Sequence, residues 1–422
     1  MATEDIIAGL DIGTTKVCAI IGERDENGSL EITGVGVSPS SGMRRGNVVN
    51  IEKALRSVLQ AIEAAELMSG REVRHCWISI GGASIEGLIS RGVVAVTGKP
   101  SESREISEAD IERVLIAARA VKLPIDREII EVIPLSYTVD QQNGIRDPRD
   151  VIGVRLECDV NIISCSTTGA RNLISCVNRS GFIVDGLVLQ TLAAGSAVLT
   201  DEEKELGVAL VDLGGGTTNV LVYSSGAPWS TFSVPVGGNQ VTGDISIVKN
   251  IAIETAEKIK INSGCCWGAL IEGLEDEIIV PGMGGRAPFP IPRSLILEII
   301  EPRMREIFNL VREQLEKQIS GARPLSGGIV LTGGGAKLLG VADLAAQVFQ
   351  MPVRIGEPLS LGGLAADFRS PEFATAVGLV LEGDSRERQA ISGNAKSKLR
   401  ESPAGRGGIF SSFYNWLKTE FF

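Results

Sequence analysis

The sequence has a single histidine, seven scattered cysteines, few aromatic residues and a net charge of −11. One imidazole cannot build a multi-histidine metal site, and His75 lies next to an apolar run, so a histidine-based catalytic triad is excluded. No cysteine pair has zinc-ligand spacing. An odd number of cysteines without a signal peptide predicts free thiols in a reducing cytoplasm. The negative charge argues against nucleic acid as a partner.

Two common phosphate-binding patterns are also missing. The P-loop needs Gly-Lys followed by Ser or Thr, but the one Gly-Lys pair here, Gly98-Lys99, precedes Pro100. The dinucleotide pattern Gly-x-Gly-x-x-Gly does not occur. Any nucleotide site in this chain must therefore be of another kind.

What the sequence does contain is a pair of short glycine loops with matching chemistry. Each follows an apolar run and leads into a second β-rich run, which predicts strand, tight turn, strand twice over. Glycines let the backbone approach a bulky anion, Thr hydroxyls and backbone N–H groups donate to phosphate oxygens, and one Asp per loop can hold Mg²⁺ through water. We expect the two loops to grip a triphosphate from both sides. Their residues are Asp11, Gly13, Thr14, Thr15 and Lys16, then Asp212, Gly214, Gly215, Gly216, Thr217, Thr218 and Asn219.

The rest of the chain has a mixed α/β pattern, and the segment 84–159 has a different sequence pattern, which predicts a small inserted α/β module. We predict helices at 51–68, 107–120, 168–180, 190–199, 242–261, 293–320, 338–348 and 371–381, with Pro302 at a break or at a second first turn. Ser107 and Asp110 have the spacing of an N-terminal cap. Strands are predicted at 76–80, 92–96, 129–133, 135–139, 160–166, 182–187 and 329–332, with a strand region at 273–292.

The C-terminal forty residues change composition twice. Residues 382–408 are rich in Ser, Gly and charge, which predicts a flexible linker. Residues 409–422 are predicted to form an amphipathic helix that is too short to span a bilayer but suited to lying in its surface. Its membrane-facing residues would be Ile409, Phe410, Phe413, Tyr414, Trp416, Leu417 and Phe421, with Glu420 misplaced among them. The alternative is a helix that docks on the protein's own core.

The two loops, followed by the third glycine loop Thr332 to Ala336, resemble the actin, Hsp70 and sugar-kinase superfamily. This resemblance implies an α/β, actin-like (ribonuclease H-like) pair of duplicated domains that clamp ATP and Mg²⁺. It implies phosphate contacts from both loops, with Asp11 and Asp212 at the metal. Gln190, with Asp212, matches the catalytic position that orients the attacking water. Glu257 and Lys260 match the pair that contacts ribose and base, unless they are simply a solvated helix face. The adenosine loop would be Gly333, Gly334, Gly335 and Ala336.

The order of segments resembles the FtsA family of actin-like cell-division proteins over essentially the whole chain. The resemblance implies a first half (1–83, 160–198 and about 365–381) with 84–159 inserted as subdomain 1C, through which later division proteins would be recruited. It implies a second half (199–225 and 301–364) and a 2B subdomain (226–300) that docks the C-terminal peptide of tubulin-like FtsZ. The tail would place filaments of the protein on the cytoplasmic membrane at the division site, with slow ATP hydrolysis or none. A sugar-kinase-type phosphotransferase, a chaperone-type ATPase and a pilus-assembly actin homologue are the alternatives.

Overall fold

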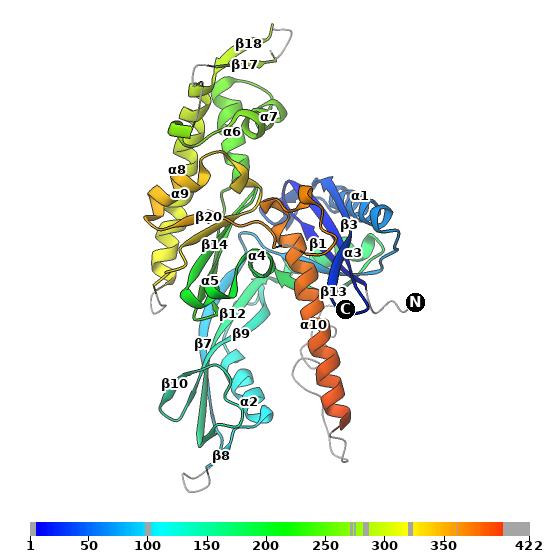
Figure 1. The fold of residues 1–422 in the computed structure, drawn as a ribbon, viewed down its shortest axis with the longest axis vertical. Coiled ribbons are helices and arrows are strands. Elements are labelled where there is room, and N and C mark those ends of the chain that lie inside the picture. Colours follow the sequence, from blue (N-terminus) through cyan, green and yellow to red (C-terminus); the bar gives the residue numbers. More distant parts are fainter. Residues whose placement is uncertain are drawn as a thin grey trace.

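Two five-stranded sheets form the centre of the computed structural model, which describes residues 6–97, 103–270, 273, 276–281, 287–319, 324–359 and 361–399 (Figure 1). The first sheet has the order β13-β6-β1-β2-β3 and the second has the order β20-β19-β14-β15-β16. The strands of the first are β1 (Ile6–Ile12), β2 (Lys16–Arg24), β3 (Leu30–Pro39), β6 (His75–Ile80) and β13 (Ile183–Leu189). Those of the second are β14 (Val208–Leu213), β15 (Thr218–Ser224), β16 (Ala227–Val234), β19 (Ile329–Thr332) and β20 (Val353–Ile355).

The two sheets repeat one topology. In each, three consecutive strands pair antiparallel as a meander, and two later strands add in parallel beside the first of the three. β1 therefore corresponds to β14, and the β1–β2 turn to the β14–β15 turn. This confirms the duplicated α/β fold that the sequence predicted. The first sheet also carries α1 (Ile51–Ser69), α3 (Thr167–Arg179) and the small hairpin of β4 (Met43–Arg44) and β5 (Asn47–Val48).

A separate four-stranded sheet, ordered β10-β9-β12-β7, forms the inserted part at one end of the molecule (Figure 1). Its strands are β7 (Glu86–Ala95), β9 (Arg127–Val139), β10 (Gln142–Ile145) and β12 (Arg155–Ser166), and β8 (Arg104–Glu105) pairs nearby with β11 (Ile152–Gly153). The helix α2 (Glu108–Arg119) begins at the Ser107–Asp110 capping box, as predicted. The two short strands predicted at 129–133 and 135–139 are wrong. A register shift beside Pro134 makes room for the proline, so β9 continues unbroken.

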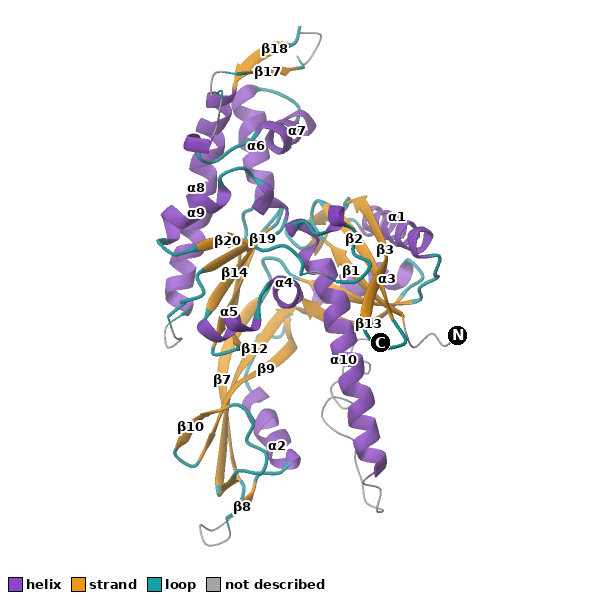
Figure 2. Ribbon diagram, viewed as in Figure 1, coloured by secondary structure: helices purple, strands orange, loops and turns teal. Residues whose placement is uncertain are grey.

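The opposite end of the molecule holds α6 (Gly238–Lys249), α7 (Ile253–Ser263) and the hairpin of β17 (Glu277–Val280) and β18 (Phe289–Pro292), with the short turn Gly268–Leu270 between them (Figure 2). The single helix predicted at 242–261 is wrong, because Asn250 adopts a left-handed conformation (φ 52°) that ends α6. The break predicted at Pro302 is also wrong. α8 (Arg293–Gln318) runs straight through it.

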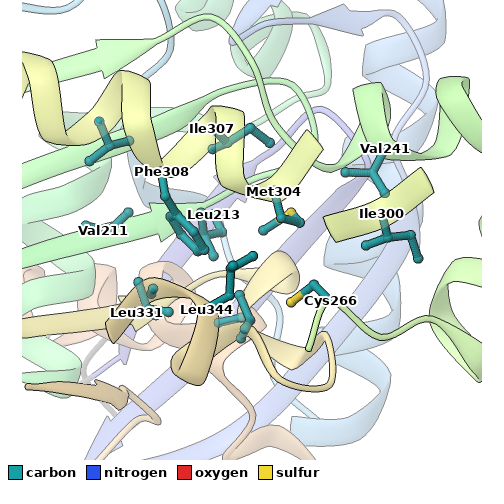
Figure 3. Packing of buried hydrophobic residues seen from close by; sticks show 14 of the residues in the cluster. Val211, Leu213, Val241, Cys266, Ile300, Met304, Ile307, Phe308, Leu331 and Leu344 are labelled. Carbon is teal, nitrogen blue, oxygen red and sulfur yellow. The ribbon is translucent and has the colours of Figure 1, made fainter. Parts of the chain in front are cut away.

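Packing explains why α8 remains continuous through Pro302. Ile300, Met304 and Phe308 lie on one face of α8, on both sides of Pro302, and all are buried in the core of the second half (Figure 3). The ring of Phe308 meets Phe349 of α9 (Val341–Phe349) edge-on, with 5.6 Å between ring centroids. Burial of such side chains contributes roughly 1.5–3 kcal/mol each, which offsets the cost of about 3 kcal/mol for an interior proline.

Two helices fill the space between the sheets. α4 (Gln190–Val198), which is followed by α5 (Asp201–Leu206), and α10 (Ala374–Leu399) share one buried cluster with Ile20 of the first sheet and Leu210 of the second. They cross so closely that a Cβ placed on Gly378 would lie 1.7 Å from the carbonyl oxygen of Ala193. This pair of helices therefore packs against both sheets within one buried cluster.

α10 extends much further than the sequence predicted. The helix predicted at 371–381 continues to Leu399, so 382–399 is not a flexible linker, and 400–408 lies outside the described residues. The middle of the helix is held by ion pairs to distant strands: Arg24 contacts Asp384 at 2.7 Å, and Arg386 contacts Glu131 of the insert at 2.8 Å. These tertiary contacts stabilise a polar helix that has little apolar surface of its own.

One prediction from composition can be checked directly. All seven cysteines are buried and unpaired, including Cys265 and Cys266, which pack as small apolar residues.

Throughout the part of the chain that the structure describes, no helix combines the length and the apolar character needed to cross a membrane.

Candidate functional site

The turns β1–β2 and β14–β15 have the same local structure. In the first, the N–H of Gly13 donates to the carbonyl of Lys16 at 3.0 Å, and in the second, Gly214 donates to Thr217 at 3.1 Å. Strand register places one aspartate at the same step of each hairpin, Asp11 in β1 and Asp212 in β14. The duplication of the fold thus extends to the atoms that close the turns.

The two turns lie against each other. A Cβ on Gly215 would lie 2.3 Å from Cγ2 of Thr15, and one on Gly216 would lie 2.9 Å from Oγ1 of Thr14. Only glycine allows this approach at 215 and 216, because any side chain would push the first turn away. The structure therefore brings the predicted phosphate residues of both loops together, at the place where the two halves meet.

Asp11 and Asp212 form a buried acidic pair behind these turns. They are 6% and 3% exposed. Burial, and then the charge of Asp11, raise the pKa of Asp212 to about 7, and burial raises the pKa of Asp11 although Ser79 donates to its Oδ1 at 2.7 Å. Oδ2 of Asp212 is buried without a hydrogen-bond partner. Two buried carboxylates with a spare oxygen fit the need of a divalent cation for oxygen ligands. Among the described residues no cluster of three or more His, Cys, Asp or Glu side chains is placed to hold a metal ion.

Gln190 and Asn219 link the two halves beside the turns. Gln190 is the first residue of α4, and its Oε1 accepts a hydrogen bond from Nδ2 of Asn219 at 3.2 Å. Oδ1 of Asn219 accepts from Ser233 at 2.8 Å, which fixes the orientation of the amide. Thr218, by contrast, is fully buried and donates to the carbonyl of Val236, so its hydroxyl is committed to the sheet.

The predicted ribose and base residues also lie next to the second turn. The N–H of Gly238, the first residue of α6, donates to the carbonyl of Gly214 at 2.9 Å. Lys260 of α7 donates to the carbonyl of Gly238 at 3.2 Å and to Thr242 at 2.9 Å, and forms a 2.8 Å ion pair with Glu257. Glu257 also accepts from Thr242. These residues are therefore part of one ordered network with the turn rather than an isolated solvated face.

The third glycine loop packs behind Asp212. Gly333 has φ 81°, and a Cβ on it would lie 2.2 Å from Oδ1 of Asp212. A Cβ on Gly335 would lie 2.8 Å from Cβ of Leu213, and Gly334 has open space around it. Ala336 is buried. All three loops therefore converge on the end of β14.

Two residues at this site were missed from sequence. Lys337 follows the third loop directly, and Glu372 lies just before α10; each bears a charge that no motif marked. Glu372 contacts both Lys337 and Lys16. Its place directly after the glycine loop 333–336 was the one available signal for Lys337. The seven residues predicted to face the membrane, Ile409 to Phe421, lie outside the described residues.

Comparison with known proteins gives the family. The family model "Cell division protein FtsA" matches residues 209–378, and "SHS2 domain inserted in FTSA" matches 82–164. The curated FtsA of Borreliella burgdorferi is 41% identical over 420 residues, covering 100% of both chains. The FtsA of Pseudomonas aeruginosa is 39% identical over 99% of this chain and 98% of its own.

Solved structures agree on the fold. A PilM–PilN type IV pilus biogenesis complex matches with a TM-score of 0.64 at 16% identity, covering 90% of this chain and 98% of that one. MreB5 of Spiroplasma citri bound to AMPPNP matches with 0.53 at 15% identity, over 94% and 100%. At these identities the structures show the actin-like fold alone. The far higher identity to FtsA proteins decides against the pilus-assembly and sugar-kinase alternatives as families.

Proposed function

Because the chain belongs to the FtsA family of cell-division proteins, we propose that it binds ATP and Mg²⁺ between its two halves, polymerises on the cytoplasmic membrane and tethers FtsZ to it. The observation that carries this proposal is the pair of matched turns pressed together over Asp11 and Asp212. A cation bound together with charged phosphates would give those two buried carboxylates the charge partner that the protein alone does not supply.

The residues divide the work of nucleotide binding. Backbone N–H groups of both turns, with the hydroxyls of Thr14 and Thr15, would donate to phosphate oxygens, and Lys16 would add a positive charge. Asp11 and Asp212 would hold Mg²⁺, which neutralises phosphate charge when bound. Lys260 and Glu257, with the third loop, would bind the adenosine. Support comes from MreB5, which shares the fold and whose structures contain ADP or AMPPNP.

We propose that Gln190 orients a water molecule; in support, its amide is held by Asn219 across the boundary between the halves. A closing motion of the halves would pass through the α4–α10 crossing, since both helices belong to the same buried cluster. We propose that nucleotide closes the halves and favours the polymerising conformation, and that hydrolysis is slow.

Partner binding is proposed at the two ends of the molecule. The end built from α6 and α7 exposes large apolar side chains that nothing among the described residues covers: Ile247, Val248, Ile253 and Ile261. Such a surface suits a peptide with apolar side chains, and we propose the C-terminal peptide of FtsZ as its occupant. The inserted sheet at the other end is proposed to recruit later division proteins. Residues 409–422 are proposed as the membrane anchor.

Recruitment of FtsZ to lipid vesicles tests the tether. Labelled FtsZ, this protein, ATP–Mg²⁺ and vesicles of phosphatidylethanolamine and phosphatidylglycerol are mixed and floated through a density gradient. Wild type should carry FtsZ to the top. Trp416→Glu removes a buried anchor worth roughly 1.5–3 kcal/mol and adds a charge, so both proteins should stay at the bottom.

Ser412→Glu is the matched control, because it adds the same charge on the polar side of the helix and should still float. Flotation of Trp416→Glu at the wild-type level would disprove the anchor. Wild type that floats without FtsZ would disprove the tether while leaving the membrane proposal intact.

A further inference from the structure

Glu372 lies between two lysines from different loops of the site. Its Oε1 is 2.5 Å from Nζ of Lys337, and its Oε2 is 3.5 Å from Nζ of Lys16. Lys16 also donates to the backbone carbonyl of Glu372 at 2.5 Å. One carboxylate therefore neutralises the cation that ends the first phosphate turn and the cation that ends the adenosine loop.

The environment keeps this carboxylate ionised. Burial alone would raise its pKa, but Lys337 and Lys16 together hold the pKa of Glu372 below its ordinary value. The Glu372 side chain is about a quarter exposed (26%), so an anion arriving from solvent can reach the ion pairs that Glu372 forms with the two lysines. Glu372 thus supplies, from within the chain, the kind of negative charge that a phosphate would bring.

Glu372 is also tied to the helix that joins the halves. It belongs to the turn Pro371–Phe373, and α10 begins at the next residue, Ala374. Nζ of Lys16 lies 3.9 Å from the centroid of the Phe373 ring. Moving Lys16 therefore loosens two contacts at the first residues before α10.

We propose that Glu372 is an internal competitor of the nucleotide: its carboxylate holds Lys16 and Lys337 until phosphate oxygens take them over, and its release frees the start of α10. The inference rests on the proposed nucleotide function. Two costs set nucleotide affinity in this arrangement, breaking the lysine contacts of Glu372 and leaving its carboxylate beside the new phosphate charge. An amide lowers the first cost, because its oxygen binds the lysines without a charge, and removes the second.

Glu372→Gln tests this in the full chain. Glutamine keeps the shape, the side-chain oxygen that faces Lys337 and the backbone carbonyl that holds Lys16, so the charge is the main change. The dissociation constant for a fluorescent ATP analogue with Mg²⁺ is measured by anisotropy. Affinity should rise roughly three- to tenfold, in keeping with partly exposed ion pairs.

Glu387→Gln is the matched control. Glu387 forms an ion pair with Arg24, away from the three loops, and the substitution changes the net charge equally. Its affinity should equal that of wild type, and the gain in Glu372→Gln should persist at 0.5 M salt, where a long-range field effect is screened. Equal affinity in wild type and Glu372→Gln, or weaker binding in Glu372→Gln, overturns the inference while the nucleotide function stands.

If neither wild type nor either variant binds the analogue, the nucleotide function and this inference fall together. Hydrogen exchange supplies the second readout. The amides of 373–380 should exchange faster in wild type with ATP–Mg²⁺ than without, and Glu372→Gln should show the faster rate before nucleotide is added. Slow exchange in nucleotide-free Glu372→Gln contradicts the proposed release.

Discussion

Replacing Asp212 by asparagine should stabilise the metal-free protein while removing its ability to bind ATP–Mg²⁺. Asp212 is buried beside Asp11, and its pKa rises from 3.8 to about 7. At about 1.4 kcal/mol per unit, a shift of about three units means that ionised Asp212 costs up to roughly 4 kcal/mol of folding free energy. Asparagine removes both the desolvation of this carboxylate and its repulsion with Asp11, so we expect a gain of about 2–4 kcal/mol for Asp212→Asn.

The sign of the pH dependence follows from the raised pKa. Below about pH 4 the carboxyl is protonated in both folded and unfolded chains, and it carries no penalty. As the pH rises towards about 7 the unfolded chain has lost the proton that the folded chain retains, so stability falls, and the full penalty remains above pH 7. The stability difference between Asp212→Asn and wild type should therefore widen from pH 5 to pH 8.

Thermal unfolding in EDTA at pH 5, 6, 7 and 8 measures this difference, and ATP–Mg²⁺ binding is measured on the same samples. Asp201→Asn is the control, because the Asp201 side chain is almost fully exposed and should change neither quantity. A lower melting temperature for Asp212→Asn at pH 8, or a difference that does not grow with pH, would refute the electrostatic reasoning. Retained ATP–Mg²⁺ affinity would refute the metal assignment.

Two further predictions concern the helices that connect the halves. Gly378→Ala should destabilise the protein by about 3 kcal/mol or more, since the new Cβ would lie 1.7 Å from the Ala193 carbonyl oxygen. Gly243→Ala, in open space on α6, should stabilise it by about 0.5–1 kcal/mol. Equal melting temperatures for the two variants would contradict the close crossing. Arg386→Leu leaves Glu131 and Glu382 half-buried without their partner and should increase hydrogen exchange beyond residue 384, with little change in 374–380. Arg388→Leu, whose side chain is half exposed, should have a smaller effect, and an equal effect would show that the ion pairs of Arg386 are unimportant.

Local signals in the sequence were sufficient for much of the fold. The paired turns, the Ser107–Asp110 cap and the strand at 329–332 depend on residues within a few positions of one another, and each formed where it was predicted. The duplicated turns also located the candidate site, because glycine is needed wherever two backbones approach closely. Residue type and spacing carry this information without any knowledge of tertiary contacts.

The errors arose where distant residues decide the outcome. Residues 382–399 look like a linker by composition, yet Arg24 and Glu131, far away in the sequence, pair with Asp384 and Arg386 and so help α10 to continue past the predicted end at 381. Pro302 looks like a break, yet the core around Phe308 keeps α8 continuous. No sequence motif marked Glu372, because its role depends on ion pairs with two lysines on other loops.

The sequence by itself determined that the chain contains two copies of one phosphate-type turn and which residues compose them. Only the tertiary structure decided that Thr14 and Thr15 face Gly216 and Gly215, that Asp11 and Asp212 share one buried space, and that α10 starts beside Lys16. The physical reason is the distance along the chain over which each kind of interaction acts. Turn and cap preferences act over a few residues, whereas burial and charge pairing depend on neighbours that the chain brings together only when it folds.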